Sequence, residues 1–181
     1  MILKETPISG ETIFEGVVFS VRVDQARIGD GSVRRRELVR HPGGVSMVIL
    51  TEQDEVLMVR QFRYGPGEVL LELPAGKLEP GEEPFEAALR EQREETGTTG
   101  RNYISLGSVY PTPAYDSEVI RLWACRVESW GEQKLDDGEL LEILRVPLQE
   151  AEDMVLRNEI RDAKTQIGIL KAASLVKRGE L

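Results

Sequence analysis

Several features that whole classes of protein depend on are scarce in this sequence. Its 181 residues include one cysteine, Cys125, so an internal disulfide is excluded and a reducing compartment is indicated. Positive charge is also scarce, because 23 Lys and Arg face 32 Asp and Glu and leave a net charge of -9. That balance argues against a protein that wraps nucleic acid, which needs a basic surface. A small phosphorylated ligand accompanied by metal ions remains compatible with it.

Long apolar runs are also missing. No stretch approaches the roughly 20 apolar residues that span a bilayer. The first apolar stretch is interrupted by Lys4, Glu5 and Pro7, which is unlike a signal peptide. Because 40% of the residues are hydrophobic, the chain can still build one domain with a core. We therefore expect an acidic, globular, cytoplasmic protein.

Strand patterns fill most of the chain. Residues 11–24 are rich in Val, Ile and Phe and predict a strand, and Asp30-Gly31 is a hairpin signal before a returning strand over 32–41. Further strands are indicated by VSMVILT, EVLMVRQFR, EVLLELPAG, ISLGSVYP, EVIRLWACRVE and LLEILRVPL. Helices are expected over about 148–157 and 162–178. An α+β or mixed α/β fold follows.

The final predicted helix has a start signal and an apolar side. Asp162 is a suitable N-cap, and Ile167, Leu170, Ala173 and Leu175 or Val176 recur near helical spacing.

An acidic helix lies between Pro84, which suits a first helical turn, and Gly97, which suits the residue after a helix. One side carries a stripe at helical spacing: Phe85, Ala88, Leu89, Gln92 and Thr96. A neighbouring face carries Glu91, Glu94 and Glu95.

Two carboxylates about 4 Å apart repel by roughly 4 kcal/mol at an effective dielectric near 20. One explanation is a solvated face on which Arg90 and Arg93 screen the glutamates. The other is a divalent cation, and oxygen ligands of this kind suit Mg²⁺ or Mn²⁺ rather than a structural zinc ion.

The spacing of the whole segment favours the cation. The segment runs Gly76, five residues, Glu82, seven residues, Arg90-Glu91, two residues, Glu94-Glu95, one residue, Gly97. This pattern resembles the signature box of the Nudix hydrolases. The resemblance implies a loop-helix-loop that carries catalytic divalent metals, an α/β/α sandwich around a mixed sheet, and hydrolysis of a nucleoside diphosphate linked to another moiety.

Two positions depart from the box, which expects an aliphatic or small residue at Gln92 and again at Thr98. Both are packing positions rather than metal ligands. Burying an unsatisfied amide costs about 1–3 kcal/mol, so Gln92 must find a hydrogen-bond partner or reach the surface. We expect an effect on stability more than on chemistry.

The flanking sequences resemble the ADP-ribose pyrophosphatase branch of the family over most of the chain. They are VRQFRYGPGEVLLELPAGKLEPGE, SVYPTPAYDSE with Pro113, LDDGELLEILRVPL and NEIRDAKTQIGILKA. The resemblance implies Mg²⁺-dependent hydrolysis of ADP-ribose to AMP and ribose 5-phosphate, with Mn²⁺ as an alternative metal. Two other functions stay open: hydrolysis of another nucleoside diphosphate sugar such as GDP-mannose, and a catalytically silent domain that binds a nucleotide sugar.

The resemblance also implies catalytic roles. The backbone carbonyl of Ala75 would join Glu91 and Glu95 in holding metal, and Glu94 would be an outer or water-mediated partner. Arg90 would brace the glutamates of the box. The loop Asp137-Gly138-Glu139 would supply the catalytic base or a further metal ligand, with Glu139 as first choice and Asp137 as second.

Substrate binding is assigned to Arg36, Arg63 and Glu72. The arginines would neutralise the pyrophosphate or stack on the base, and Glu72 would hydrogen-bond ribose or adenine. Arg36 could instead line an exposed strand with its arginine neighbours.

Four other side chains have less specific signals. Phe14 and Phe19 are the nearest candidates for the aromatic residue that stacks on adenine in relatives, unless they lie in the core. His41 is interpreted as a turn residue and Cys125 as a core residue.

We expect one Nudix domain over residues 1–181. Within it, about 1–42 would be an N-terminal β-hairpin extension used for dimerisation, and about 43–181 the catalytic core. The expected partners are a small nucleoside diphosphate sugar and a second copy of the chain, with no nucleic acid polymer and no membrane.

Overall fold

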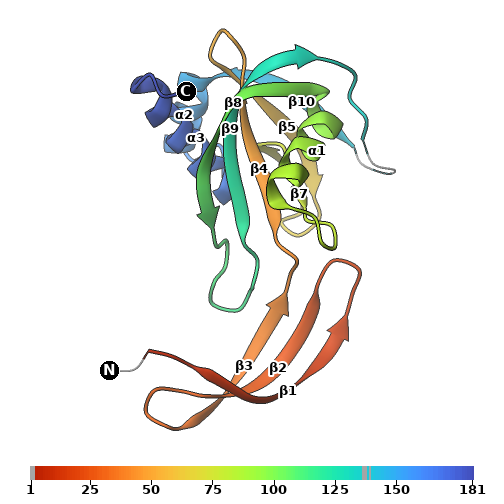
Figure 1. The fold of residues 1–181 in the computed structure, drawn as a ribbon, viewed down its shortest axis with the longest axis vertical. Coiled ribbons are helices and arrows are strands. Elements are labelled where there is room, and N and C mark those ends of the chain that lie inside the picture. Colours follow the sequence, from red (N-terminus) through yellow and green to blue (C-terminus); the bar gives the residue numbers. More distant parts are fainter. Residues whose placement is uncertain (1–2, 136–137, 139) are drawn as a thin grey trace. The chain divides into compact units, whose positions relative to one another are not determined.

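The computed structural model describes residues 3–135, 138 and 140–181 (Figure 1). The predicted base candidates Asp137 and Glu139 lie outside the described residues. The chain divides into two compact units. The first contains the residues up to Gly43 together with Tyr110–Val119, and the second contains Gly44–Val109 and Ile120–Leu181.

The first unit is a three-stranded antiparallel sheet in the order β1-β2-β3. Its strands are β1 (Thr6–Glu15), β2 (Ser20–Arg27) and β3 (Val33–Arg40). The single strand predicted over residues 11–24 is wrong, because the chain turns in its middle. Gly16 N–H donates to Phe19 O at 3.0 Å, and a side-chain carbon at Gly16 would lie 2.7 Å from the ring of Phe14.

The Asp30-Gly31 hairpin is confirmed. Gly31 has φ 85°, a left-handed conformation that glycine adopts without strain, and Ser32 N–H donates to Asp30 Oδ1 at 2.8 Å. His41 is a turn residue, as predicted, because its Nδ1 accepts a hydrogen bond from Gly43 N–H at 3.1 Å.

The second unit contains a mixed sheet in the order β10-β5-β4-β9-β8, with β6 paired to β5 and β7 paired to β4. Neighbouring strands are antiparallel except β4 and β9, which are parallel. The strands are β4 (Gly44–Leu50), β5 (Glu55–Arg63), β6 (Glu68–Glu72), β7 (Ala75–Lys77), β8 (Thr98–Val109), β9 (Ile120–Trp130) and β10 (Leu141–Pro147). The helices are α1 (Pro84–Thr96), α2 (Leu148–Leu156) and α3 (Ala163–Lys177).

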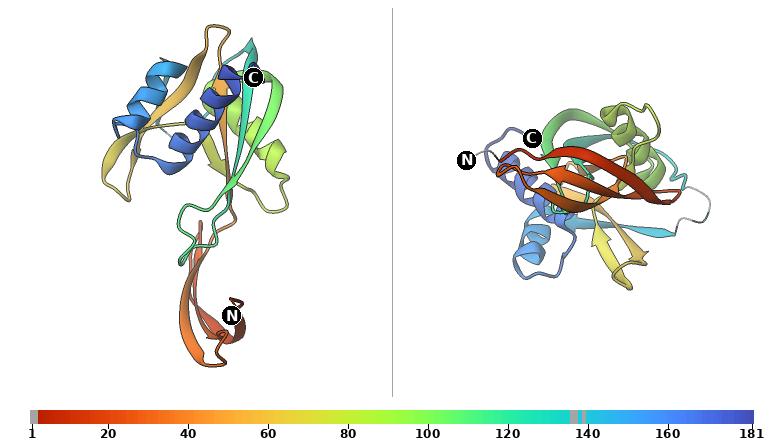
Figure 2. Two further views of the ribbon diagram at one scale, coloured as in Figure 1. Left: turned by 90° about the vertical axis from the view of Figure 1, so that its left-hand side faces the viewer. Right: turned by 90° about the horizontal axis from the view of Figure 1, so that it is seen from below.

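Helices cover both faces of this sheet, with α1 on one side and α2 and α3 on the other (Figure 2). The central strand β4 shows why. All of its residues are buried, and successive side chains point to opposite faces. Met47 and Ile49 pack in the cluster that contains Ala88 of α1, whereas Val48 and Leu50 pack in the cluster that contains α2 and α3. The predicted α/β/α sandwich around a mixed sheet is confirmed.

The helix ends follow the predicted signals. Pro84 is the first residue of α1, and Gly97 ends the helix with φ 66° and a hydrogen bond of 2.9 Å to Arg93 O. Asp162 caps α3 by accepting from Thr165 N–H. The predicted apolar side of α3 is wrong at Leu170, which is 40% exposed, because Ile169 faces the core instead.

In the part of the chain that the structure describes, none of the helices combines the length and apolar character that a bilayer-crossing segment needs.

Candidate active site

The 76–97 segment begins at a short loop that is fixed to the centre of the sheet. Pro74 O accepts hydrogen bonds from Met47 N–H at 3.1 Å and from Ser46 Oγ at 2.9 Å. Ala75 then pairs with Ser46 as the first residue of β7. The backbone that leads into the acidic helix is therefore held by the buried strand β4.

Glu95 reaches this loop from the last turn of α1. Its side chain is buried, and Oε2 accepts a hydrogen bond of 2.9 Å from Ala75 N–H. The structure thus brings together Ala75 and Glu95, two of the residues predicted to hold metal. In the structure Glu95 contacts the backbone N–H of Ala75. The metal-binding role assigned to the backbone carbonyl of Ala75 stays a prediction.

Glu91 lies against Gly76. A side-chain carbon at Gly76 would lie 1.7 Å from Glu91 Oε1 and 2.0 Å from its carboxyl carbon. A side chain at position 76 would therefore displace the Glu91 carboxylate from its place beside the loop.

Arg90 relieves the repulsion among the carboxylates. Its Nε and Nη2 donate to the two oxygens of Glu82 at 2.9 and 3.1 Å, and its Nη1 donates to Glu91 Oε1 at 2.7 Å and to Glu94 Oε2 at 2.9 Å. The hydrogen bond to Glu82 raises the pKa of Arg90, and the same bond lowers the pKa of Glu82. Arg90 thus makes ion pairs with three glutamates of the box, and its role as a brace for them stays a prediction.

The side chains of this cluster have the donor atoms that a hard divalent cation prefers. The donors are carboxylate oxygens, which Mg²⁺ and Mn²⁺ prefer, and the missing side chain of Gly76 leaves the space that the Glu91 carboxylate occupies. Among the described residues, no three acidic, histidine or cysteine side chains are gathered as a finished metal site. Arg90 engages one oxygen of Glu91 and one of Glu94. A cation at this cluster would share the Glu91 and Glu94 carboxylates with Arg90.

Arg63 and Glu72, both assigned to substrate binding, contact each other. Arg63 Nε and Nη2 donate to Glu72 Oε1 and Oε2 at 2.7 and 2.9 Å, a bidentate pair from adjacent strands β5 and β6. Glu72 is 1% exposed, whereas the Arg63 side chain is 40% exposed. The guanidinium is thus anchored on a buried carboxylate, while part of the Arg63 side chain stays exposed.

Two residues that the sequence analysis did not assign to the site complete this cluster. Lys164 Nζ contacts Glu72 Oε2 at 2.5 Å and Asp162 Oδ2 at 2.9 Å. Burial would raise the pKa of Glu72, but the hydrogen bond from Arg63 and the charge of Lys164 outweigh it and lower that pKa. The only sequence signal for Lys164 was its place within NEIRDAKTQIGILKA.

Arg36 belongs to the first unit. It makes a bidentate pair with Glu5, with Nε to Oε2 at 2.8 Å and Nη2 to Oε1 at 2.7 Å. The pair is partly exposed. Phe14 and Phe19 are not core residues, because both are largely exposed and pack on each other with ring centroids 5.8 Å apart. Their role in stacking stays a prediction.

Comparison with known proteins identifies the family. The model of the NUDIX domain matches residues 40–166. The chain belongs to the NUDIX domain family. It is 37% identical to the ADP-ribose pyrophosphatase of Bacillus subtilis (strain 168) over 169 residues, which cover 92% of this chain and 91% of that protein. It is 35% identical over 170 residues to the methanol dehydrogenase activator of Bacillus methanolicus, with 93% and 92% covered.

A solved structure described as an ADP compounds hydrolase shares the fold of this Nudix protein. The TM-score is 0.83 at 22% sequence identity, and the match covers 100% of this chain and 99% of the other.

The two departures from the Nudix box compensate each other. Gln92 is 1% exposed, and its Nε2 donates to Thr98 Oγ1 at 3.2 Å. Its Oε1 accepts from Tyr103 Oη at 3.0 Å. Thr98 Oγ1 also lies 2.7 Å from Thr96 Oγ1. The buried amide of Gln92 is therefore satisfied by hydrogen bonds, and Thr98 is one of the partners.

Cys125, beside this network, is buried as predicted. Burial raises the pKa of its thiol to about 12, so the thiol stays protonated at neutral pH.

Replacing both Gln92 and Thr98 should destabilise the protein by less than the sum of the two single replacements. Gln92→Leu and Thr98→Val should each lower the free energy of unfolding by about 1–3 kcal/mol, because each leaves a polar partner unsatisfied. The loss of stability in the double variant should be smaller than the sum, since both sides of the Gln92–Thr98 hydrogen bond are then apolar. Chemical denaturation measures all three. Thr99→Val, which removes a hydroxyl that pairs with Ser129 in an exposed position, is the control. Additive losses would contradict the coupling.

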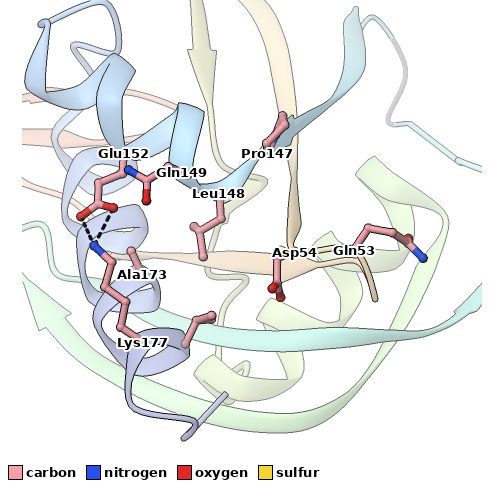
Figure 3. A pocket seen from close by; sticks show the side chains of 9 residues that line it. Gln53, Asp54, Pro147, Leu148, Gln149, Glu152, Ala173 and Lys177 are labelled. Carbon is pink, nitrogen blue, oxygen red and sulfur yellow. Dashed lines mark hydrogen bonds and ion pairs between the residues drawn. The ribbon is translucent and has the colours of Figure 1, made fainter.

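One cavity of the second unit lies away from the box. It has a volume of about 310 Å³ and lies beside α2 and α3 (Figure 3). An ion pair between Glu152 and Lys177, with Nζ 2.9 Å from both carboxylate oxygens, forms part of its wall. Among the described residues, none of those predicted for the Nudix site lines it.

Proposed function

We propose that this Nudix protein hydrolyses the pyrophosphate bond of ADP-ribose and releases AMP and ribose 5-phosphate. The observation that carries the proposal is the acidic box held in order by Arg90 and Gly76, in the same unit as the anchored Arg63. The similarity to the Bacillus subtilis ADP-ribose pyrophosphatase across most of both chains supports the choice of substrate.

In this proposal the box glutamates hold Mg²⁺, with Mn²⁺ as the alternative. Glu91, Glu95 and the carbonyl of Ala75 are the ligands, and Glu94 is an outer partner. When bound, such cations supply positive charge that offsets the repulsion between pyrophosphate oxygens and an incoming nucleophile. Arg90 orients Glu82, Glu91 and Glu94 through its ion pairs.

In this proposal Glu139 accepts the proton of the attacking water or serves as a further metal ligand, and Asp137 is the second candidate. Arg63 contacts the pyrophosphate or the base with the part of its guanidinium that Glu72 leaves accessible, and Glu72 orients it or binds ribose. Arg36 is proposed as a further substrate contact.

A substrate panel with Mg²⁺ and Mn²⁺ tests the proposed function. ADP-ribose should be hydrolysed in preference to GDP-mannose and other nucleoside diphosphate sugars, with AMP as the product detected. Preferred turnover of GDP-mannose would contradict the substrate assignment. Binding of ADP-ribose in calorimetry without turnover under both metals would instead support a catalytically silent binding domain.

Removing divalent cations should abolish this turnover. With excess chelator we expect a loss of at least about 10³-fold, because the charge that stabilises the transition state is gone. Added Mg²⁺ should restore activity, and the thermal midpoint should show that the fold survives the treatment. Undiminished turnover in chelator would contradict a metal-dependent mechanism.

We further propose that the chain acts as a cytoplasmic homodimer joined through its first unit. Residues 1–42 would then be the dimerisation extension, and 43–181 the catalytic core. All ten residues of β1 are exposed, and they include Ile8, Ile13 and Phe14. Apolar side chains gathered on a small sheet are typical of a protein–protein interface.

Ile13→Asp should convert a dimer to a monomer in light scattering, because a charge would be buried against the partner. Glu11→Gln, on the same strand, should leave the mass unchanged. A monomeric wild-type protein would contradict the proposal.

A further inference from the structure

The first turn of α3 contacts the end of β6, although the two lie far apart in the sequence. Lys164 is 8% exposed, and its Nζ lies between Glu72 Oε2 at 2.5 Å and Asp162 Oδ2 at 2.9 Å. A buried ammonium is stable only where carboxylates pair with it. Here the carboxylates of Glu72 and Asp162 fix the position of the Lys164 ammonium.

The same turn also fixes the backbone next to Glu72. Leu73 N–H donates to Thr165 Oγ1 at 2.9 Å in a buried hydrogen bond. Thr165 in turn donates to the capping carboxylate of Asp162, from N–H at 2.9 Å and from Oγ1 at 2.6 Å. The helix start that holds Lys164 is therefore rigidly connected to the strand that carries Glu72.

Glu72 receives donors from two directions. Arg63 donates to both of its oxygens, and Lys164 donates to Oε2. Lys164 thereby opposes rotation of the carboxylate, and the carboxylate sets the plane of the Arg63 guanidinium through the bidentate pair. Glu72 also lies three residues before Ala75, at the start of the loop that Glu95 contacts.

We propose that Lys164 is a positioning residue for substrate binding. It holds the Glu72 carboxylate, and through it the Arg63 guanidinium, in the orientation that receives the nucleotide sugar. The inference rests on the proposed function, because it takes Arg63 and Glu72 as substrate contacts. A purely structural ion pair would contribute to stability and leave affinity unchanged.

The test compares Lys164→Met and Lys164→Arg with wild type. Lys164→Met should raise both KM for ADP-ribose and the Kd measured by calorimetry in chelator, where turnover stops, by about 10-fold or more, the scale of one lost charge-assisted hydrogen bond. Its kcat should stay within about threefold, because the residue acts on binding rather than on the chemical step. Lys164→Arg, which keeps the charge, should recover much of the affinity.

Lys171→Met is the matched control. Lys171 lies on the same helix, and its Nζ donates to the backbone at Leu106 O at 2.5 Å. Removing it should change the thermal midpoint without changing KM or Kd. Equal effects of Lys164→Met and Lys171→Met on affinity would overturn the proposal.

A second comparison uses the Glu72→Gln background. If Lys164 acts through Glu72, adding Lys164→Met there should change KM and Kd by less than about twofold. Effects that multiply would mean that Lys164 acts independently, and would overturn the proposal. This background also guards against misfolding, because it removes the buried charges together.

The two proposals fail in different ways. A wild-type protein that neither binds nor hydrolyses ADP-ribose contradicts the proposed function, and the inference falls with it. A fully active wild type with unchanged affinity in Lys164→Met contradicts the inference alone.

Discussion

Glu95→Gln should lower turnover of ADP-ribose by about 10³-fold or more while leaving the protein folded. The substitution keeps the size of the side chain and an oxygen that can accept from Ala75 N–H. It removes the negative charge that would hold a divalent cation against the pyrophosphate, and losses of this scale follow when such electrostatic stabilisation is removed. Steady-state kinetics with saturating Mg²⁺ measure the turnover, and the circular dichroism spectrum shows whether the protein stays folded.

Glu86→Gln is the control for this variant. Glu86 is an exposed residue in the first turn of α1. Glu86→Gln therefore makes the same charge change on the same helix as Glu95→Gln, but away from the proposed metal ligands. Its turnover should stay within about twofold of wild type, as for surface substitutions in general. Near-normal activity of Glu95→Gln would reject the metal assignment. Equal losses in both variants would show that the net charge of the helix matters, rather than one ligand.

The sequence predicted the acidic helix well because its boundaries depend on local chemistry. Pro84 and Gly97 mark the ends through their own backbone preferences, and no distant residue has to be known. The strand prediction over residues 11–24 failed because apolar residues continue through the turn. Gly16 is the only glycine in that stretch, which contains no proline.

Helix α3 shows a second limit, since its contact with the sheet is made by small residues. A side-chain carbon at Gly168 would lie 3.2 Å from Val48 Cγ2 on β4, and Ala172 and Ala173 are also buried. Periodicity arguments weigh large apolar residues most, so they placed Leu170 on the inner side. The close approach of helix and strand decides the face instead.

The contacts of the candidate site also differ in how far they could be predicted from the sequence. The contact of Arg90 with Glu94 follows from i,i+4 spacing within one helix. The contact of Lys164 with Glu72 joins residues 92 positions apart and depends on how α3 packs beside β6. The pairing of Gln92 with Thr98 spans the end of the helix, and each residue alone was recognised only as a departure from the family pattern.

Arg90→Met should reduce turnover by about 10²-fold and also destabilise the protein. Glu82, Glu91 and Glu94 would lose the cation that they share, and carboxylates this close repel by up to about 4 kcal/mol per pair. Arg90→Lys should recover only a small part of the activity, because an ammonium cannot replace the fork that meets Glu82 bidentately while reaching two further carboxylates. Arg93→Met, an exposed position on the same helix, should change neither turnover nor stability much.

The stability loss in Arg90→Met should depend on pH, and its sign follows from Glu82. Arg90 lowers the pKa of Glu82 in the folded protein, so this pair contributes stability above the unfolded pKa and loses it as the pH falls through the folded pKa. The gap in thermal midpoint between wild type and Arg90→Met should therefore be widest near neutral pH and narrow as the solution is acidified below the ordinary glutamate range. A gap that stays constant with pH would mean that Arg90 stabilises the box by packing its aliphatic stem, and the electrostatic account of the acidic cluster would then be wrong.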